Sequence, residues 1–82
     1  ASTERLGAET ANAMNRRAAA LLQLGRAAEA REAAAALVER FVREYGEGDV
    51  QLARYRVVLA EAELALDQPA AARRLLEQAL PM

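Results

Sequence analysis

Apolar residues recur at intervals of three and four along most of the chain, the spacing that places side chains on one face of an α-helix. Short breaks separate successive series, and no segment alternates apolar and polar residues with a period of two. The pattern therefore predicts an all-α fold without strands, with helices near residues 8–24, 27–45, 50–66 and 69–80. The core-facing positions expected in these helices are Ala11, Met14, Ala18 and Leu21; Ala30, Ala34, Leu37, Phe41 and Tyr45; Leu52, Tyr55, Leu59, Ala62 and Leu66; and Ala72, Leu75, Leu76, Ala79 and Leu80.

The breaks contain residues that end or begin helices. Gly25 and the glycines of segment 46–48 can adopt positive φ and end a helix. Asp49 can cap the following helix by accepting its free amide hydrogens. Pro69 suits a first helical turn, where its missing N–H is not needed, and Pro81 stops the last helix. These residues predict two helical hairpins joined by a longer connection.

The two hairpins are related by an offset of 42 residues. The offset aligns Leu24-Gly25-Arg26 with Leu66-Asp67-Gln68, which places one turn on the other. Several aligned pairs are alanines, which coincide often in so alanine-rich a chain. The alignment predicts one domain over residues 1–82, with a first repeat at about 9–48 and a second at about 49–82.

The chain resembles a tetratricopeptide repeat over about residues 9–80, in the longer form found in kinesin light chains. The segments that carry the resemblance are "TANAMN" at the first helix, "LGRAAEA" at the turn and "REYGEGDVQLA" before the second repeat. The resemblance implies antiparallel hairpins stacked with a right-handed superhelical twist. Arg16 and Arg17 stand where the family usually has Asn and Leu, Glu63 replaces a large apolar residue, and Asp67 stands where Gly is common.

The amino-acid composition disfavours several classes of function. The chain has 82 residues, of which 54% are hydrophobic, and alanine supplies half of these. The 11 basic residues are all Arg and are scattered among 12 acidic ones, a pattern that disfavours nucleic-acid binding. No apolar run approaches the roughly 20 residues that cross a membrane. No disulfide or thiolate metal site can form without cysteine, and a cytoplasmic location fits.

Catalysis is disfavoured by the residues that are missing. The sequence has no His, Cys or Lys, and Ser2 is its only serine, so no Ser–His or Cys–His pair can form. The glycines lack the spacing of phosphate-binding loops. Glu61 and Glu63 are two residues apart and diverge on a helix. We therefore expect no enzyme activity, no catalytic or metal-binding residues and no cofactor.

The resemblance implies a binding face on the first helix of each hairpin. In this family those helices line a concave surface, where Asn side chains hydrogen-bond the backbone of an extended peptide. Asn15 lies at such a position. Asn12 and Asn15 could instead be solvated residues near a helix start, and Arg54 and Glu61 could be ordinary surface charges. The expected peptide-binding residues are Asn12, Asn15, Leu22, Arg54, Val57, Glu61 and Leu64, in rows that also include Ala19.

Two functions follow from these observations. The first is a protein–protein interaction module within a larger signalling or regulatory protein, with a protein or peptide partner. The second is a structural helical spacer or an oligomerisation segment without a peptide ligand. Val57, Val58 and Leu64 widen the apolar surface of the third helix, which predicts packing on several sides. The apolar fourth helix, with Leu75, Leu76 and Leu80, is the expected contact of a symmetric homodimer.

Overall fold

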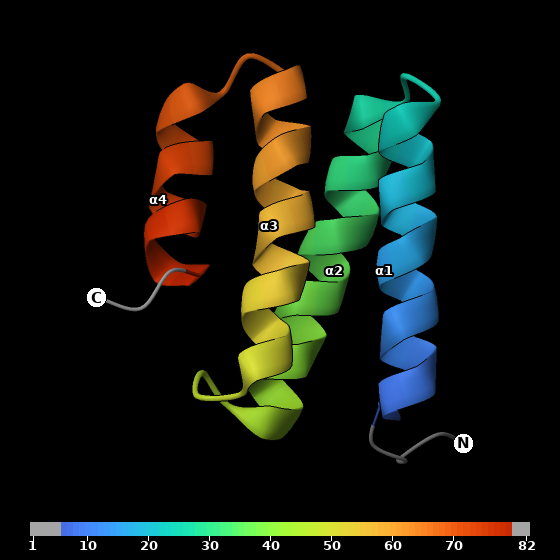
Figure 1. Ribbon diagram of the computed structural model, residues 1–82, viewed down its shortest axis with the longest axis vertical. Coiled ribbons are helices and arrows are strands. Elements are labelled where there is room, and N and C mark those ends of the chain that lie inside the picture. Colours follow the sequence, from blue (N-terminus) through green and yellow to red (C-terminus); the bar gives the residue numbers. More distant parts are fainter. Residues whose placement is uncertain (1–5, 80–82) are drawn as a thin grey trace.

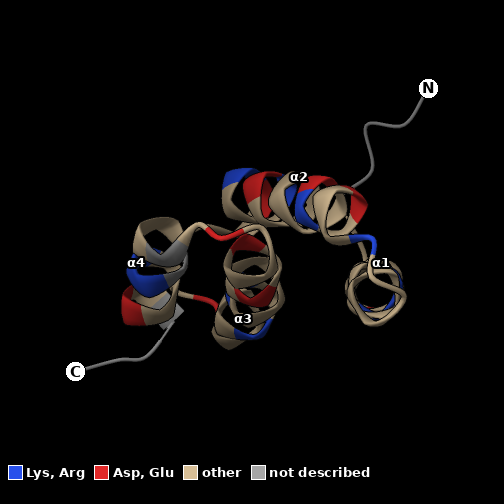
Figure 2. Ribbon diagram, turned by 90° about the horizontal axis from the view of Figure 1, so that it is seen from above, with Lys and Arg blue, Asp and Glu red and all other residues tan. Residues whose placement is uncertain are grey.

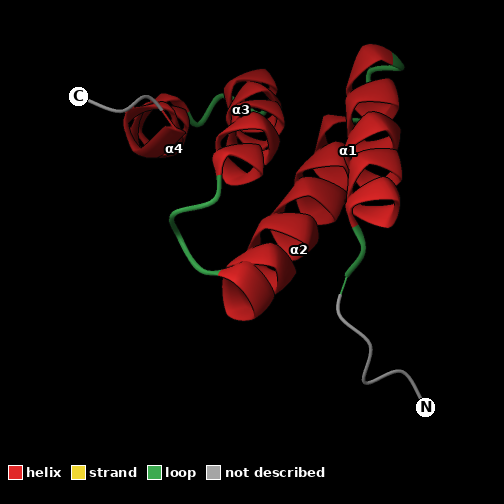
Figure 3. Ribbon diagram, turned by 60° about the horizontal axis from the view of Figure 1, so that its bottom comes forward, coloured by secondary structure: helices red, strands yellow, loops and turns green. Residues whose placement is uncertain are grey.

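The helical periodicity of the sequence is realised as four α-helices in the computed structural model, which describes residues 6–79 apart from the side chains of residues 69, 72 and 79. The helices are α1 (Ala8–Gln23), α2 (Ala27–Tyr45), α3 (Val50–Ala65) and α4 (Pro69–Ala79) (Figure 1). Within this part of the chain only helices and loops occur (Figure 3). The expected all-α fold is confirmed, and Leu80 lies outside the described residues.

Consecutive helices run antiparallel and supply most of the contacts between elements, whereas α1 and α3 touch over a smaller area. Seen from above, α1 and α3 lie on one side of α2, and α4 flanks α3 (Figure 2). The molecule is thin, with extents of 36 × 32 × 16 Å. Each helix hairpin therefore packs mainly on its neighbour, as in a stack of repeats.

The core is small and depends on close helix approach. Its largest fully buried side chains are Tyr55, Leu37 and Leu52. The ring of Phe41 meets Tyr55 edge-on at a centroid distance of 5.2 Å, a favourable aromatic geometry. Around these residues, alanines allow the helix backbones to lie close together. The fully or almost fully buried alanines are Ala11, Ala18, Ala30, Ala34, Ala60 and Ala62.

Tyr45 was expected to face the core but lies at its edge. Tyr45 is 38% exposed, because it follows the last buried turn of α2 and directs its hydroxyl to the Leu6 carbonyl. Val57 and Leu64, which were expected on the binding row, are exposed on a side of α3 that none of the described helices covers. Conversely, Leu6 is buried although it precedes the first helix. The expected packing of α3 on several sides is confirmed, because α3 contacts α1, α2 and α4.

The turn of the first hairpin is a Schellman motif. Gly25 adopts φ +80°, the Arg26 N–H donates to the Leu21 carbonyl at 2.9 Å, and the Gly25 N–H donates to the Leu22 carbonyl at 3.1 Å. Two carbonyls that α1 leaves unsatisfied at its end are thereby paired. Gly25 suits the position because residues with a Cβ disfavour this backbone region.

The turn of the second hairpin has the same hydrogen bonds. Asp67 adopts φ +62°, Gln68 N–H donates to the Glu63 carbonyl at 2.8 Å, and Asp67 N–H donates to the Leu64 carbonyl at 3.0 Å. Asp is one of the few residues other than Gly that visits this region readily. The two turns that the 42-residue offset aligns thus share one geometry, with Asp67 in the place of Gly25.

The connection between the hairpins is fixed at both ends. Gly46 has φ +84° and ψ −178°, a combination essentially restricted to glycine. Asp49 caps α3 as expected, because its carboxylate accepts a hydrogen bond of 2.8 Å from the Gln51 N–H. This connection places the start of α3 at the same end of the molecule as the start of α1, the lower end in Figure 1.

Candidate binding face between α1 and α3

The α3 side of the expected binding face is open to solvent. Arg54, Val57, Glu61 and Leu64 follow one another at helical spacing and are all exposed. The exposed fraction of Leu64 reaches 53%. Two apolar side chains and two opposite charges therefore share one accessible row, which can contact both apolar and charged groups of a partner.

The α1 side of the face is partly covered. Asn12, Asn15, Ala19 and Leu22 are half-buried. Asn12 is engaged within the fold, because its Oδ1 accepts a hydrogen bond of 2.9 Å from the Tyr55 hydroxyl. This bond ties α1 to α3, so the alternative interpretation of Asn12 as a merely solvated residue is wrong. Burial raises the pKa of Tyr55 above 10.0, and of the nearby charges Arg54 lowers it while Asp49 raises it.

Asn15 differs from Asn12 in lacking such a partner. Asn15 as a whole is half-buried. Its Oδ1 atom, however, is shielded from solvent and accepts no hydrogen bond from any described residue. Asn15 follows Asn12 by three residues and so lies on nearly the same face of α1. A buried acceptor without a donor costs about 1–3 kcal/mol, and a partner N–H group could pair with this shielded oxygen only after the Asn15 side chain turns outward.

A pocket missed from the sequence lies at the lower end of this face. We name it the lower pocket; its volume is about 120 Å³. It begins at Ala8, which precedes Asn12 by one helical turn, and at Gln51, which precedes Tyr55 by one turn. In the sequence, this pocket is signalled by the four-residue spacings from Ala8 to Asn12 and from Gln51 to Tyr55. The lower pocket is lined by Leu6, Ala8, Phe41, Tyr45, Asp49, Gln51 and Tyr55.

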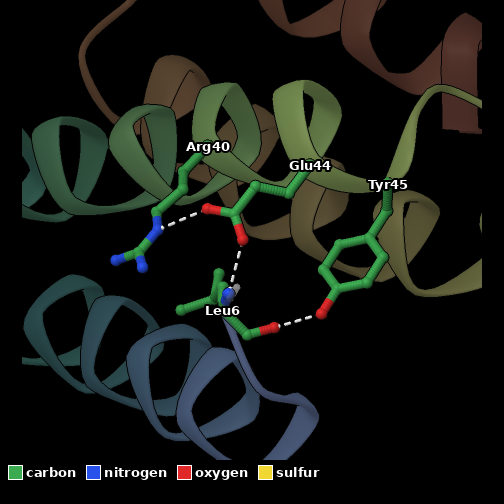
Figure 4. A network of polar contacts seen from close by, with 4 residues as sticks. All are labelled: Leu6, Arg40, Glu44 and Tyr45. Atoms are coloured by element: carbon green, nitrogen blue, oxygen red, sulfur yellow. Dashed lines mark hydrogen bonds and ion pairs between the residues drawn. The ribbon is translucent and has the colours of Figure 1, made fainter. Parts of the chain in front are cut away.

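One wall of the lower pocket is held by side chains of α2. The Leu6 N–H donates to the Glu44 carboxylate, and the Tyr45 hydroxyl donates to the Leu6 carbonyl (Figure 4). Arg40 in turn donates to Glu44 at 2.8 Å. Both backbone polar groups of Leu6 are therefore satisfied, which allows its side chain to be buried beside Phe41.

Two charged residues of α3 are buried, and each has one ionic partner. Glu63 accepts from Arg31 of α2, and Arg56 donates to Glu47 at 2.6 Å. The Arg56 Nε remains shielded without a partner among the described residues. These pairs join the hairpins and the α2–α3 connection, and so have a structural role.

Other kinds of site are weakly supported. Within residues 6–79, no group of three or more Asp, Glu, His or Cys residues is arranged to hold a metal ion. None of the described helices is both long and apolar enough to cross a membrane. Acidic and basic residues are interspersed along α2, α3 and α4 instead of forming one charged stripe (Figure 2).

Comparison with known proteins identifies the family. A model of the tetratricopeptide repeat matches residues 9–82, almost the whole chain. Neither the search of curated proteins nor that of solved structures gave a match. The matched region contains both hairpins and both Schellman turns. The chain therefore belongs to the tetratricopeptide repeat family, whose members are non-catalytic protein–protein interaction modules.

Proposed function

We propose that this chain binds an extended segment of a partner protein along the face between α1 and α3. The chain would act in the cytoplasm, as one domain of a larger signalling or regulatory protein, with repeats at about 9–48 and 49–82. Arrays of such repeats usually stack three or more units, which supports the larger context. The proposed contacts are Asn12, Asn15, Leu22, Arg54, Val57, Glu61 and Leu64.

The observation that carries this proposal is the unpartnered Oδ1 of Asn15. A carboxamide oxygen can accept a backbone N–H, and the same side chain can donate to a backbone carbonyl. An extended peptide offers both groups without any sequence requirement. Asn12 differs, because its oxygen already accepts from Tyr55 and only its amide N–H groups would face a partner.

The α3 row supplies the selectivity of the proposed site. Val57 and Leu64 are exposed apolar side chains about two turns apart on the same face of α3. Burying them against a partner would be favourable. Arg54 and Glu61 alternate with them, so a partner with opposite charges at matching positions is favoured. Its binding should therefore weaken as the salt concentration rises.

The test begins with selection of binding peptides from a random library on the immobilised 82-residue chain. The affinities of the selected peptides are then measured for the wild type and for Asn15→Ala. We expect Asn15→Ala to weaken binding roughly fivefold to tenfold, the effect of one buried hydrogen bond. The free variant should be as stable as the wild type or more stable, because a buried acceptor without a donor has been removed.

Thr10→Ala is the matched control, because Thr10 is an exposed polar residue of the same helix outside the proposed face. It should leave peptide affinity unchanged. A loss of stability in Asn15→Ala without any loss of affinity would contradict the proposed role of Asn15. Failure to obtain any peptide with saturable binding would favour the spacer function.

A second candidate is self-association through α4. Leu75 packs against the core and Leu76 is half-buried, so both retain apolar surface that a neighbouring helix could cover. A symmetric dimer would bury this surface in a closed contact. Sedimentation over a range of concentrations tests it: Leu76→Gln should shift a dimer towards monomer, and a monomeric wild type at high micromolar concentration would contradict it.

A further inference from the structure

The lower pocket is where all three aromatic residues of the chain meet. Phe41 and Tyr45 have ring centroids 4.8 Å apart, and Tyr55 meets Phe41 at 5.2 Å. Aromatic faces carry partial negative charge and attract cations. The aromatic residues lie on α2 and α3, and the pocket also includes the start of α1, so three helices contribute to one small cavity.

The polar side-chain atoms of this cavity are largely acceptors. The hydroxyl hydrogen of Tyr55 is already donated to Asn12, so the Tyr55 oxygen can only accept. The Oε1 of Gln51 is shielded and accepts no hydrogen bond from the described residues. Asp49 adds a carboxylate, one oxygen of which accepts a hydrogen bond from the Gln51 N–H. A ligand suited to this set donates hydrogen bonds and carries positive charge.

We propose that the lower pocket binds a primary ammonium group of the partner, held by Asp49 and Gln51 and enclosed by the rings of Phe41, Tyr45 and Tyr55. This inference rests on the proposed function, since the ammonium group belongs to the segment that lies on the face between α1 and α3. Ala8 and Asn12 are one turn apart on α1, so a segment passing Asn12 reaches the pocket.

Two positive charges near the pocket, at the start of α1 and on Arg54, disfavour binding of a cation, but both have a weak effect. The start of α1 carries a partial positive charge of roughly +0.5 from its free N–H groups. Arg54 is a full charge but is exposed, so solvent and salt screen it. Asp49 carries a full negative charge, and no described basic side chain forms an ion pair with it.

The chemistry of Asp49 and the size of the cavity favour ammonium over guanidinium. A guanidinium is best held by both oxygens of a carboxylate, whereas one oxygen of Asp49 already caps α3. An ammonium needs one oxygen from each of several acceptors. The volume of about 120 Å³ corresponds to roughly four water-sized groups, which suits an ammonium with a short alkyl chain.

The first measurement is an NMR titration of the full 82-residue chain, labelled with ¹⁵N, using propylammonium chloride at low and constant ionic strength. We expect saturable shifts of the backbone amides of Ala8, Gln51 and Tyr55. Propan-1-ol is the neutral control of similar size and should give no saturable shift at these amides. Equal binding of propan-1-ol, or no saturable shift with propylammonium, would overturn the proposal.

The second measurement uses Asp49→Asn, which removes the charge but keeps a residue that caps helices well. This variant should bind propylammonium at least about fivefold more weakly with an otherwise unchanged spectrum, because an ion–ion contact becomes ion–dipole. An unchanged affinity would overturn the role of Asp49. Gln51→Leu gives an independent check, since it removes the unpaired acceptor without touching the capping carboxylate.

Two amine probes distinguish the source of the ammonium group. N-acetyl-lysine methylamide presents a lysine side chain, and alanine methylamide presents a chain amino terminus. Tighter binding of the first assigns the pocket to lysine, and tighter binding of the second assigns it to an amino terminus. Propylammonium has no peptide backbone, so its binding reports on the lower pocket alone, and a failure of that pocket is distinguishable from a failure of the proposed peptide face. Thr10→Ala, outside both sites, should leave propylammonium affinity unchanged.

Discussion

The two hairpins close with the same Schellman turn, yet the residues that form it differ in kind. At the position of positive φ the first hairpin has Gly25 and the second Asp67. Where the first turn begins with Leu21, the second begins with the buried Glu63. The backbone geometry of a repeat is thus kept while its side chains diverge, because the turn depends on main-chain hydrogen bonds and on one residue that tolerates positive φ.

The hairpins differ also in their surroundings. α3 lies between α2 and α4, and its buried residues include Arg56 and Glu63, which pair with charges on neighbouring segments. Among the described helices, α1 lies at the edge of the stack, next to α2 and close to α3. Of its two half-buried carboxamides, that of Asn12 also joins elements through Tyr55, whereas we propose that the carboxamide of Asn15 meets a partner.

The largest expected effect concerns Glu63 and Arg31. Arg31→Ala should destabilise the fold by about 2 kcal/mol, because the Glu63 side chain is 8% exposed and would lose its ionic partner. Glu63→Leu, which copies the first hairpin, should change stability by less than about 1 kcal/mol, since the Arg31 side chain is 52% exposed and remains solvated. Urea unfolding measures both.

Arg26→Ala is the control for that comparison, because the Arg26–Glu29 pair is exposed on both sides. It should change the free energy of unfolding by no more than a few tenths of a kcal/mol. If Glu63→Leu proved more destabilising than Arg31→Ala, the buried carboxylate would have a stabilising role that this account does not give it.

The two turns themselves provide the next comparison. Gly25→Ala should cost about 1 kcal/mol, because alanine disfavours φ +80° although no atom obstructs its Cβ. Asp67→Gly should gain about 0.5 kcal/mol by relieving a smaller strain of the same kind. Gly48→Ala is the control and should be nearly neutral, since Gly48 has no positive φ and no neighbour within 4 Å. Thermal unfolding that gave both turn variants the same sign would show that the turns are not equivalent.

The last comparison concerns Tyr55, whose counterpart in the first repeat is Ala13. Because burial raises the pKa of Tyr55 above 10.0, the folded state resists ionisation that the unfolded state undergoes. Stability should fall as the pH rises from about 10 towards the folded pKa. Tyr55→Phe should lose about 1 kcal/mol at neutral pH with its bond to Asn12, and its stability should fall less steeply above pH 10. Equal slopes for the two proteins would contradict this.

The helices could be predicted from the sequence to within about one residue, because strong periodicity and local punctuation agree. Gly25, Asp49 and Pro69 act through their own backbone chemistry, so their effect is readable without knowledge of the tertiary fold. The burial of individual α3 positions was harder to predict. That helix has apolar residues around much of its circumference, so its own pattern does not reveal that Val57 and Leu64 face solvent.

The proposed binding face follows from the sequence as two helical rows, but the hydrogen bonds of its polar residues do not. Asn12 is engaged by Tyr55, which is 43 residues away in sequence, whereas the Asn15 Oδ1 has no such partner among the described residues. The lower pocket was missed for the same reason, because it combines residues of several segments. Leu6 in particular precedes any periodic pattern, and only its bonds to α2 bury it.

The most direct test of the central claim is an NMR footprint of a selected peptide on the ¹⁵N-labelled chain. Our account predicts shift changes centred on Asn15, Arg54, Val57 and Leu64, extending to Gln51 for peptides that carry an accessible ammonium group. The opposite face of α2, including Glu32 and Glu39, should be unaffected. A footprint centred on α2 or α4, with the amides of α1 and α3 unchanged, would contradict the account.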